Sequence, residues 1–230
     1  MAQALTLISS MATRLLLAEL LAGYEAATGE RVEAESVGGV DAARRVQAGE
    51  PFDAVMLASQ AIDQLVAAGR VLPGSRVDIV RSGVAIAVRA GAQAPPIGDE
   101  QAVRAAVLAA RSIGFSTGPS GVHLQALFER WGIADAIRER IAQAPPGVPV
   151  ARLVADGRVE LGFQQLSELL NVPGIEVVGP LPGEIQIVTT FAAGVCATSG
   201  EPQRVRRLLA WLAGPQARAA KRRHGMDAAA

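Results

Sequence analysis

The chain has 230 residues and is poor in cysteine, histidine and aromatic residues, which excludes several kinds of site. Cys196 is the only cysteine, so neither an intrachain disulfide nor a cysteine metal cluster can form. The two histidines, His123 and His224, are too few and too far apart in the sequence for a zinc signature. We therefore expect no metal site and no cofactor.

The chain also lacks an excess of charge of either sign. It has 22 Lys+Arg and 22 Asp+Glu residues, and aromatic residues make up only 3%. A nucleic-acid-binding protein needs a basic face, and single-strand binding needs aromatic rings on which bases stack. No apolar run reaches the ~20 residues of a membrane-spanning helix. Nucleic acid and membrane insertion are therefore not expected.

No secretory leader is evident at the start of the sequence. A leader combines a basic segment, an apolar segment and a cleavage site with small residues. Here Met1-Ala2-Gln3 is followed directly by an apolar strand, and Leu15-Leu16-Leu17 continues into Glu19. Two alternatives stay open: a cytoplasmic protein, or a periplasmic protein whose leader has been removed.

What the sequence does contain is an alternation of short apolar strands with amphipathic helices, which is typical of an α/β protein with mainly parallel sheets covered by helices. Hydrophobic residues make up 50% of the chain, enough for a large core. The predicted strands are 4–8, 31–36, 53–57, 83–88, 112–115, 159–163, 175–178 and 186–195. The predicted helices are 12–28, 40–48, 60–68, 100–109, 120–131, 134–141, 149–156, 164–170 and 202–212.

Two segments suggest that the chain crosses between two lobes. Arg81-Ser82-Gly83 precedes one alternating strand, and Thr189-Thr190-Phe191 lies within another. We predict lobe I from residues 1–82 and 191–230, lobe II from residues 83–190, hinges near 82 and 191, and a ligand cleft between the lobes. The basic run 221–224 is interpreted as a solvated helix end.

Three polar corners join predicted strands to predicted helices. They are Ser9-Ser10-Met11, the segment 36–41 with Gly38-Gly39, and the segment 116–121 with Thr117 and Ser120. Backbone N–H groups and the positive end of the helix dipole converge at such a corner. The sequence therefore predicts an anionic ligand held by several helix N-termini.

Each corner also has a purely structural interpretation. Ser9 and Ser10 are expected to cap the first helix, with or without ligand contact. Gly38-Gly39 is equally well explained as a tight turn. His123 is more typical of a hydrogen-bonded structural residue than of a proton donor. Cys196 is expected to be a buried small apolar residue rather than a reactive thiol.

The order of these motifs resembles the molybdate-binding family of ABC-transporter solute-binding proteins, which have the type II periplasmic-binding-protein fold. The resemblance covers nearly the whole chain. It rests on the segments 9–13, 24–29, 36–39, 47–55, 119–122 and 159–163. It implies a two-lobed fold, an anionic ligand and, for a secreted protein, a membrane permease as partner.

The chain departs from this family at the ligand positions. Oxyanion-binding members have serines where this chain has Met11 and Val40, and a tyrosine where it has Gln165. Each hydrogen bond to a charged acceptor contributes about 1.5–3 kcal/mol, so these changes weaken oxyanion binding. Apolar contacts beside amide groups favour a small organic acid, with Arg14 or Arg81 as further partners for its carboxylate.

The leading hypothesis is a non-catalytic protein that closes on a small organic acid. Its alternatives are an isomerase on the same scaffold, which would use Asp41, His123 and Glu168 for proton transfer, and a molybdate, tungstate or sulfate binder. The predicted ligand-binding residues are Ser9, Ser10, Met11, Gly38, Gly39, Val40, Asp41, Ser59, Thr117, Ser120, Gly121, Val122, Gln164 and Gln165.

Overall fold

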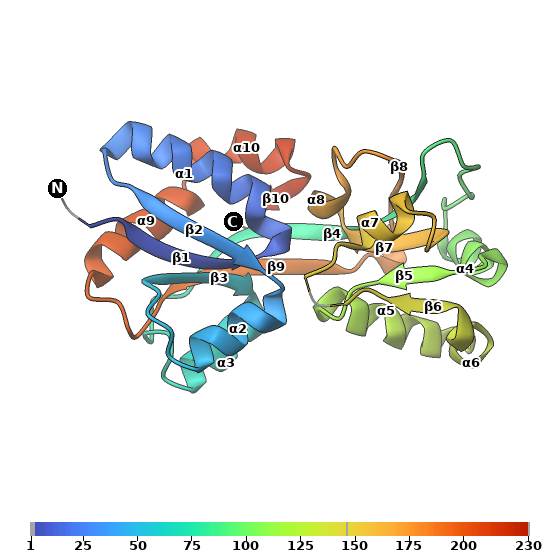
Figure 1. Cartoon of the computed structure of the whole chain (residues 1–230), viewed down its shortest axis with the longest axis horizontal. Coiled ribbons are helices and arrows are strands. Elements are labelled where there is room, and N and C mark those ends of the chain that lie inside the picture. Colours follow the sequence, from blue (N-terminus) through green and yellow to red (C-terminus); the bar gives the residue numbers. More distant parts are fainter. Residues whose placement is uncertain (1–2, 146, 230) are drawn as a thin grey trace. The chain divides into compact units, whose positions relative to one another are not determined.

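The computed structural model describes residues 3–145 and 147–229. The chain divides into two compact units, which we call unit 1 (Met1–Ser82 and Thr189–Ala230) and unit 2 (Gly83–Val188). Two strands, β4 (Val77–Arg89) and β9 (Val188–Val195), contain the residues at which the chain passes from one unit to the other (Figure 1). Each unit has its own sheet and its own helices.

The sheet of unit 1 is built on three parallel strands. The strand β1 (Leu5–Ser10) lies between β2 (Val32–Val37) and β3 (Ala54–Ala58). Beyond β3 the sheet is antiparallel, because β9 pairs with β3 and β10 (Met226–Ala228) pairs with β4. The helices of this unit are η1 (Met11–Thr13), α1 (Arg14–Thr28), α2 (Gly39–Gln47), α3 (Ser59–Ala67), α9 (Pro202–Ala213), η4 (Pro215–Ala217) and α10 (Arg218–Arg223).

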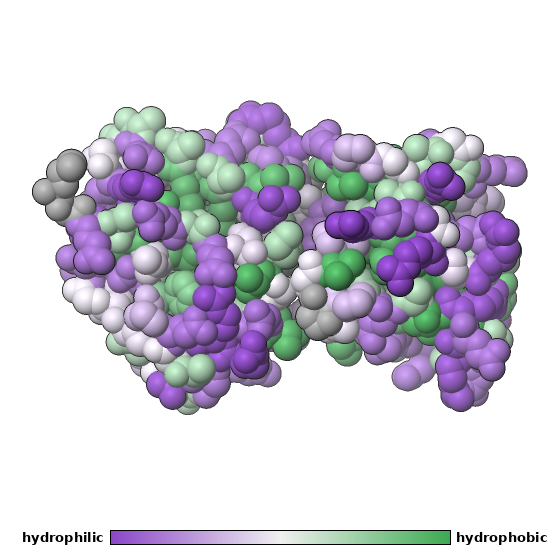
Figure 2. All heavy atoms as spheres, viewed as in Figure 1, coloured by the Kyte–Doolittle hydropathy of each residue, from purple (hydrophilic) through white to green (hydrophobic). Residues whose placement is uncertain are grey.

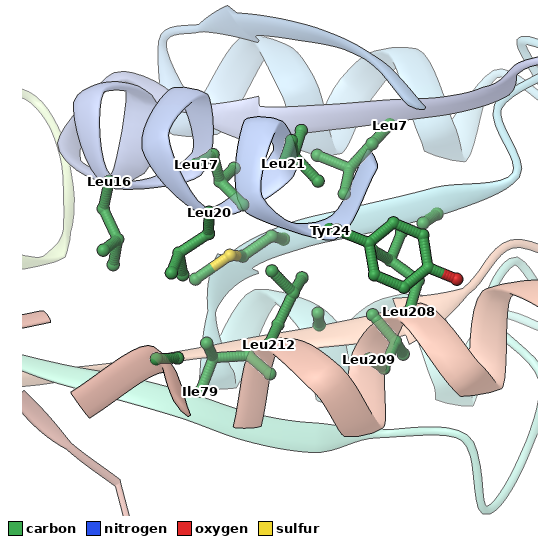
Figure 3. Close-up of a cluster of buried hydrophobic side chains, with 14 of the residues drawn as sticks. Leu7, Leu16, Leu17, Leu20, Leu21, Tyr24, Ile79, Leu208, Leu209 and Leu212 are labelled. Carbon is green, nitrogen blue, oxygen red and sulfur yellow. The ribbon is translucent and has the colours of Figure 1, made fainter. Parts of the chain in front are cut away.

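Apolar side chains of β1 and β3 point to both faces of the sheet, so these two strands are buried on both faces, whereas β2 is largely exposed. Leu7 and Met56 face the cluster that α1 and α9 cover, while Ile8 and Val55 face the cluster under α2 and α3 (Figure 1). Figure 3 shows the first cluster, in which leucines of α1 interdigitate with leucines of α9 and Tyr24 closes one end. Helix α1 ends at Gly29, whose φ of 72° is left-handed and favours glycine.

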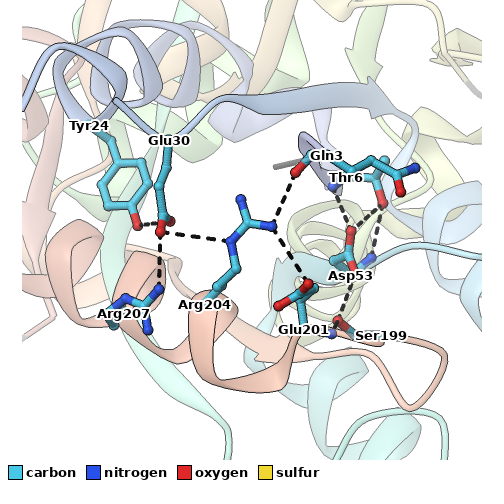
Figure 4. A network of polar contacts seen from close by, with 9 residues as sticks. All are labelled: Gln3, Thr6, Tyr24, Glu30, Asp53, Ser199, Glu201, Arg204 and Arg207. Atoms are coloured by element: carbon cyan, nitrogen blue, oxygen red, sulfur yellow. Dashed lines mark hydrogen bonds and ion pairs between the residues drawn. The ribbon is translucent and has the colours of Figure 1, made fainter. Parts of the chain in front are cut away.

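A network of hydrogen bonds joins the two sequence segments of unit 1 near the starts of β1 and β3. The Asp53 carboxylate accepts hydrogen bonds from the Thr6 N–H at 2.9 Å and from the Ser199 hydroxyl at 2.7 Å (Figure 4). In the same view, Tyr24 donates to Glu30, and burial raises the pKa of the Tyr24 hydroxyl to about 12. These groups lie at the amino ends of the strands, and their hydrogen bonds are structural.

The sheet of unit 2 also has three parallel strands. The strand β5 (Ile113–Phe115) lies between β6 (Ile141–Gln143) and β7 (Leu161–Gln165), while β4 runs antiparallel to β7 and to β8 (Ile175–Pro180). The helices are α4 (Glu100–Ala109), α5 (Pro119–Arg130), α6 (Ala134–Ile137), η2 (Arg138–Arg140), α7 (Val150–Ala155), α8 (Leu166–Leu169) and η3 (Gly183–Ile185).

Aromatic rings lie at the centre of the core of unit 2. Phe128 of α5 packs against Phe115 and Phe163 with ring centroids 6.1 and 6.2 Å apart. Helices α4 and α5 cover this face of the sheet, and the short helices α7 and α8 cover the other. On the face of the molecule shown in Figure 2, hydrophilic side chains predominate and hydrophobic ones form small separate groups.

The fold is the predicted α/β architecture, and most predicted elements are present within two or three residues. The main differences are as follows. The strand predicted at 83–88 is the second half of the longer β4; the helix predicted at 134–141 ends at Ile137; and β6, β10 and the range of α10 were not predicted. Among the described residues, no helix is long and apolar enough to span a membrane.

The prediction that the basic run 221–224 is solvated is wrong for Lys221. Lys221 is 1% exposed, and its ammonium donates to the Ile79 carbonyl of β4 at 2.9 Å. Burial lowers the pKa of this lysine. The sequence could not reveal this position, because β10 brings the end of the chain back onto β4 through a pairing that no local pattern encodes.

Candidate functional site

The carboxyl ends of the three parallel strands of unit 1 meet at one sheet edge. Ser9 lies opposite Ser36 on β2 and opposite Met56 on β3. Each strand is followed immediately by a helix: η1 after β1, α2 after β2, and α3 after β3. The sequence therefore places three helix N-termini side by side at this edge, and the positive end of each dipole lies there.

The two serines at the end of β1 have different roles. Ser9 is fully buried, and its hydroxyl lies 2.7 Å from the Ser36 hydroxyl. Ser10 is 7% exposed, and its buried Oγ has no hydrogen-bond partner among the described residues. A Cβ on Gly39 would lie 3.5 Å from the Ser10 Cβ, so the start of α2 packs directly against Ser10.

The prediction that Ser9 and Ser10 cap the first helix is wrong. Neither η1 nor α1 has a side-chain cap, because the Ser9 hydroxyl is used by Ser36 and the Ser10 hydroxyl does not turn back to the helix. The starts of α2 and α3 also have no side-chain cap. In α2 the first intrahelical hydrogen bond runs from the Ala42 N–H to the Gly38 carbonyl. The N–H groups before Ala42 have no acceptor within the helix, so they are available to an anion.

Charged and apolar groups surround this edge. Asp41, half-buried in the first turn of α2, forms an ion pair with Arg44 of the same helix. Arg14, the first residue of α1, is exposed and forms no ion pair among the described residues. Val40 is 61% exposed, which is unusual for a large apolar side chain. Met11, Gly38 and Ser59 are half-buried.

In unit 2, β5 leads into α5 through a corner that only glycine allows at position 121. A Cβ on Gly121 would lie 1.9 Å from the backbone oxygen of Ser116, far inside van der Waals contact. The Gly121 N–H donates to the Gly118 carbonyl at 2.9 Å. The backbone of α5 therefore starts tightly against the end of β5, and α5 has no side-chain cap.

The side chains of this corner range from buried to exposed. Ser120 is 6% exposed, Thr117 is exposed, and Val122 is 61% exposed. The His123 Nδ1 lies 2.9 Å from the Pro119 carbonyl, which fits its interpretation as a hydrogen-bonded residue of the helix. His123 also lines a hollow of about 280 Å³ together with Arg130 and Glu184.

The end of β7 carries two buried glutamines, Gln164 and Gln165, followed by α8. The Gln164 Oε1 accepts from the Ala151 N–H at 3.1 Å, and its Nε2 donates to the Glu168 carboxyl at 2.8 Å. Glu168 is half-buried, and desolvation raises its pKa to about 7, while the hydrogen bond from Gln164 acts in the opposite direction.

The predicted residues therefore fall into two groups. Those of unit 1 lie on the ends of adjacent strands and the first turns of the following helices. Those of unit 2 lie at the ends of β5 and β7, which pair with one another. Of the three proposed acid or base groups, Asp41 is already ion-paired and His123 is exposed; Glu168 has the desolvated carboxyl.

Sequence reasoning missed Ser36 and Ala151. The hydroxyl of Ser36 required knowledge of the β1–β2 register, because it becomes a neighbour of Ser9 only through that pairing. The contact of Gln164 with Ala151 joins a strand to a helix earlier in the chain. Among the described residues, no group of three or more His, Cys, Asp or Glu side chains is arranged to hold a metal ion.

Comparisons with known proteins agree with this architecture. Residues 5–227 match the model of the family described as bacterial extracellular solute-binding protein, and the chain belongs to this family. Its relatives include an aconitate isomerase from Pseudomonas sp, which is 38% identical over 219 residues; the match covers 93% of this chain and 83% of that protein.

Similar solved structures include oxyanion-binding proteins. The periplasmic molybdate-binding protein of Azotobacter vinelandii superposes with a TM-score of 0.81 at 21% identity, over 96% of this chain and 98% of that one. The sulfate-binding protein of Mycobacterium tuberculosis H37Rv superposes with a TM-score of 0.79 at 18% identity, over 98% and 86%. These neighbours establish the fold, which is that of the type II periplasmic binding proteins.

Proposed function

We propose that this protein binds a small organic acid with more than one carboxylate. The observation that carries the proposal is the row of three uncapped helix starts at one edge of the unit 1 sheet, beside the unpartnered hydroxyl of Ser10. Backbone N–H groups at helix starts bind carboxylates, and Arg14 adds a positive charge next to η1.

An organic acid fits these residues better than a tetrahedral oxyanion. Val40 presents an exposed apolar side chain where the resemblance to oxyanion-binding proteins implies a serine, and the half-buried Met11 adds an apolar group at the start of η1. A carbon skeleton gains from apolar contact, whereas an oxyanion would lose hydrogen bonds worth about 1.5–3 kcal/mol each. The relative named for aconitate acts on a molecule of this kind.

The mechanism proposed for binding is closure. The unit 1 corners take one carboxylate of the ligand. The hinges are proposed near residues 82 and 191. If the protein is secreted, its partner is the permease of an ABC transporter, as in the family to which it belongs.

A second candidate is the isomerisation of an unsaturated acid by proton transfer. It is favoured by Glu168, whose carboxyl has a pKa of about 7, and by the 38% identity to an aconitate isomerase. A general base is most effective when its pKa is close to the working pH.

The chemistry of such a step balances without a co-reactant. The base removes a proton from the CH2 group of the acid, and the electron pair delocalises over the neighbouring double bond and carboxylate. The same proton, or one from solvent, then returns to the far carbon of the allylic system. The double bond moves or changes geometry, and the composition of the acid is unchanged.

Two measurements test these proposals. Thermal unfolding is recorded with cis-aconitate, trans-aconitate, citrate, molybdate and sulfate over a range of concentrations, because a ligand that binds only the folded state raises Tm further as its free concentration increases. We expect the tricarboxylates to stabilise the protein and the oxyanions to have little effect. A larger stabilisation by molybdate would refute the organic-acid proposal.

The second measurement follows the same acids by proton NMR in deuterated buffer. Exchange of the CH2 protons, or interconversion of the two aconitates, supports isomerisation. Glu168→Gln provides the control, because it keeps the size of the side chain and removes the base. Stabilisation by an acid without any exchange leaves binding as the function and rejects the second candidate.

A further inference from the structure

We propose that Gln164 is a positioning residue: it orients the Glu168 carboxyl so that one oxygen always accepts a hydrogen bond and only the other exchanges a proton with the ligand. This inference deepens the second candidate function above and rests on it for its role in turnover. The juxtaposition that it uses lies wholly within unit 2.

The orientation of the Gln164 amide is fixed by its surroundings. Its Oε1 faces the Ala151 N–H, at 3.1 Å, in the first turn of α7. A backbone N–H can only donate, so the atom that faces it must be the amide oxygen. The Nε2 group, a donor, therefore points at Glu168, and the amide cannot flip without placing two donors against each other.

This arrangement makes the two carboxyl oxygens of Glu168 unequal. Oε1 accepts from the Gln164 Nε2 at 2.8 Å. In a neutral carboxyl group the carbonyl oxygen is a better acceptor than the hydroxyl oxygen, so the hydrogen bond from Gln164 to Oε1 favours the proton on Oε2. Oε2 has no hydrogen-bond partner among the described residues, so the ligand meets the oxygen that carries the proton.

In the described part of the chain, no charged side chain is held close to the Glu168 carboxyl by the elements that pack against it, so the hydrogen bond from Gln164 is its main polar contact. The strand β7, which packs against α8, carries no titratable side chain. In the unit 2 part of β4 and on α7 and β8, the charged residues are Arg89, Arg152 and Glu176, and all three are exposed. Arg152 is paired with Asp156 of its own segment.

Both polar atoms of the Gln164 amide form hydrogen bonds within unit 2, as a positioning role requires. Gln164 is 3% exposed, and its oxygen and nitrogen are already engaged by Ala151 and Glu168. Its effect on a ligand is therefore transmitted through Glu168. A residue with only a structural role would hold α7 on β7 but would leave the titration of Glu168 unchanged.

The test is a titration of the Glu168 carboxyl by carbon-13 NMR in the full-length protein without ligand, with the signal assigned from Glu168→Gln. Gln164→Met keeps the length of the side chain and removes the donor. We expect the titration midpoint of Glu168 to rise by about one pH unit, because the charged form loses its hydrogen bond.

Gln186→Met is the matched control. The Gln186 amide also bridges two groups of unit 2, accepting from the Val84 N–H at 2.9 Å and donating to the Leu181 carbonyl at 3.1 Å. The control loses equivalent hydrogen bonds away from Glu168, so its Glu168 midpoint should equal that of the wild type. Equal midpoints in Gln164→Met and the control would overturn the inference.

Gln164→Glu decides the question if Gln164→Met does not fold. It retains an acceptor for the Ala151 N–H but places a second carboxyl against Glu168. We expect the pair to titrate in two steps, one of them well above pH 7, because the two groups share a proton. A single step near the wild-type midpoint would contradict the inference. Since these titrations need no ligand, their outcome is independent of whether an organic acid binds.

Discussion

The corners of unit 1 and unit 2 differ in how they can hold negative charge. In unit 1 the groups that can hold an anion do not change their charge with pH near neutrality. They are three uncapped helix starts and the hydroxyl of Ser10. In unit 2 the end of β7 adds Glu168, whose carboxyl has a pKa of about 7. Unit 1 therefore offers permanent dipoles, and unit 2 offers a group that changes charge.

This difference separates binding from chemistry. Backbone N–H groups bind a carboxylate at any pH at which it is ionised, and they cannot transfer a proton at neutral pH. A desolvated carboxyl with a near-neutral pKa repels an anion when charged and donates to it when protonated. We therefore expect changes in unit 1 to alter affinity and changes in unit 2 to alter the dependence on pH.

The largest effect is expected at the corner of unit 2. In Gly121→Ala the new methyl group would meet the Ser116 carbonyl at 1.9 Å, so the start of α5 has to move. We expect a loss of at least about 3 kcal/mol in the free energy of unfolding, measured with urea.

Gly118→Ala is the control within the same corner. Its Cβ would lie 3.6 Å from the Ser116 Oγ, an ordinary contact, and the φ of Gly118 is −75°. We expect less than about 1 kcal/mol of change. Equal effects at the two glycines would show that the tight corner does not determine the packing of α5.

The second effect concerns pH and Glu168. The pKa of its carboxyl is raised from an ordinary value of 4.5 to about 7 in the folded protein, so the folded state binds more protons than the unfolded state between these values. Stability should therefore fall as the pH rises from about 4.5 to about 7, by roughly 2 kcal/mol after allowance for partial exposure.

Glu168→Gln should remove this slope and be more stable than the wild type at pH 8. Urea unfolding at pH 5 and at pH 8 measures both statements. If the free energy of unfolding changes between pH 5 and pH 8 by the same amount in the wild type and in the variant, the Glu168 carboxyl is solvated. That result would also remove the basis for its role in proton transfer.

A smaller effect distinguishes the two serines of unit 1. Ser9→Ala removes a buried hydrogen bond to Ser36 and should destabilise the protein by about 1 kcal/mol. Ser10→Ala removes a hydroxyl without a partner, so we expect nearly unchanged stability and weaker binding of the organic acid. Thermal unfolding with and without the acid measures both; a Ser10→Ala variant with wild-type affinity would exclude Ser10 from the site.

The smallest effect is expected for Val40→Ser, which restores a hydroxyl that oxyanion-binding relatives have. Val40 is 61% exposed, so stability should change by less than about 0.5 kcal/mol. Affinity for molybdate should rise about tenfold, and affinity for the organic acid should fall. Calorimetric titration with both ligands checks this, and an unchanged preference would show that Val40 does not face the ligand.

The local patterns were sufficient to predict the α/β class and the three polar corners. Alternation in β1 and β3 reports burial on both faces, and Gly29 marks the end of α1 by its left-handed φ. The short elements were harder to predict. Three-residue strands such as β6 and β10 have no periodicity of their own and exist only because a longer strand pairs with them.

The details of the site depended on contacts between distant residues. That the Ser9 hydroxyl bonds to Ser36, and leaves the helix uncapped, follows from the register of β1 and β2. That Gln164 bridges Ala151 and Glu168 follows from the packing of α7 on β7. A residue type at a corner indicates that a group is available, whereas its partner is decided by tertiary structure.

The central claim is that the helix starts of unit 1 bind the carboxylate of an organic acid. The most direct test is a nitrogen-15 NMR titration of the backbone amides with trans-aconitate. We predict the largest shifts at the first-turn amides of η1, α2 and α3, with a Kd that agrees with the one obtained from the rise of Tm with ligand concentration. Saturable binding that leaves those amides unchanged, or stabilisation only by molybdate, would contradict the account.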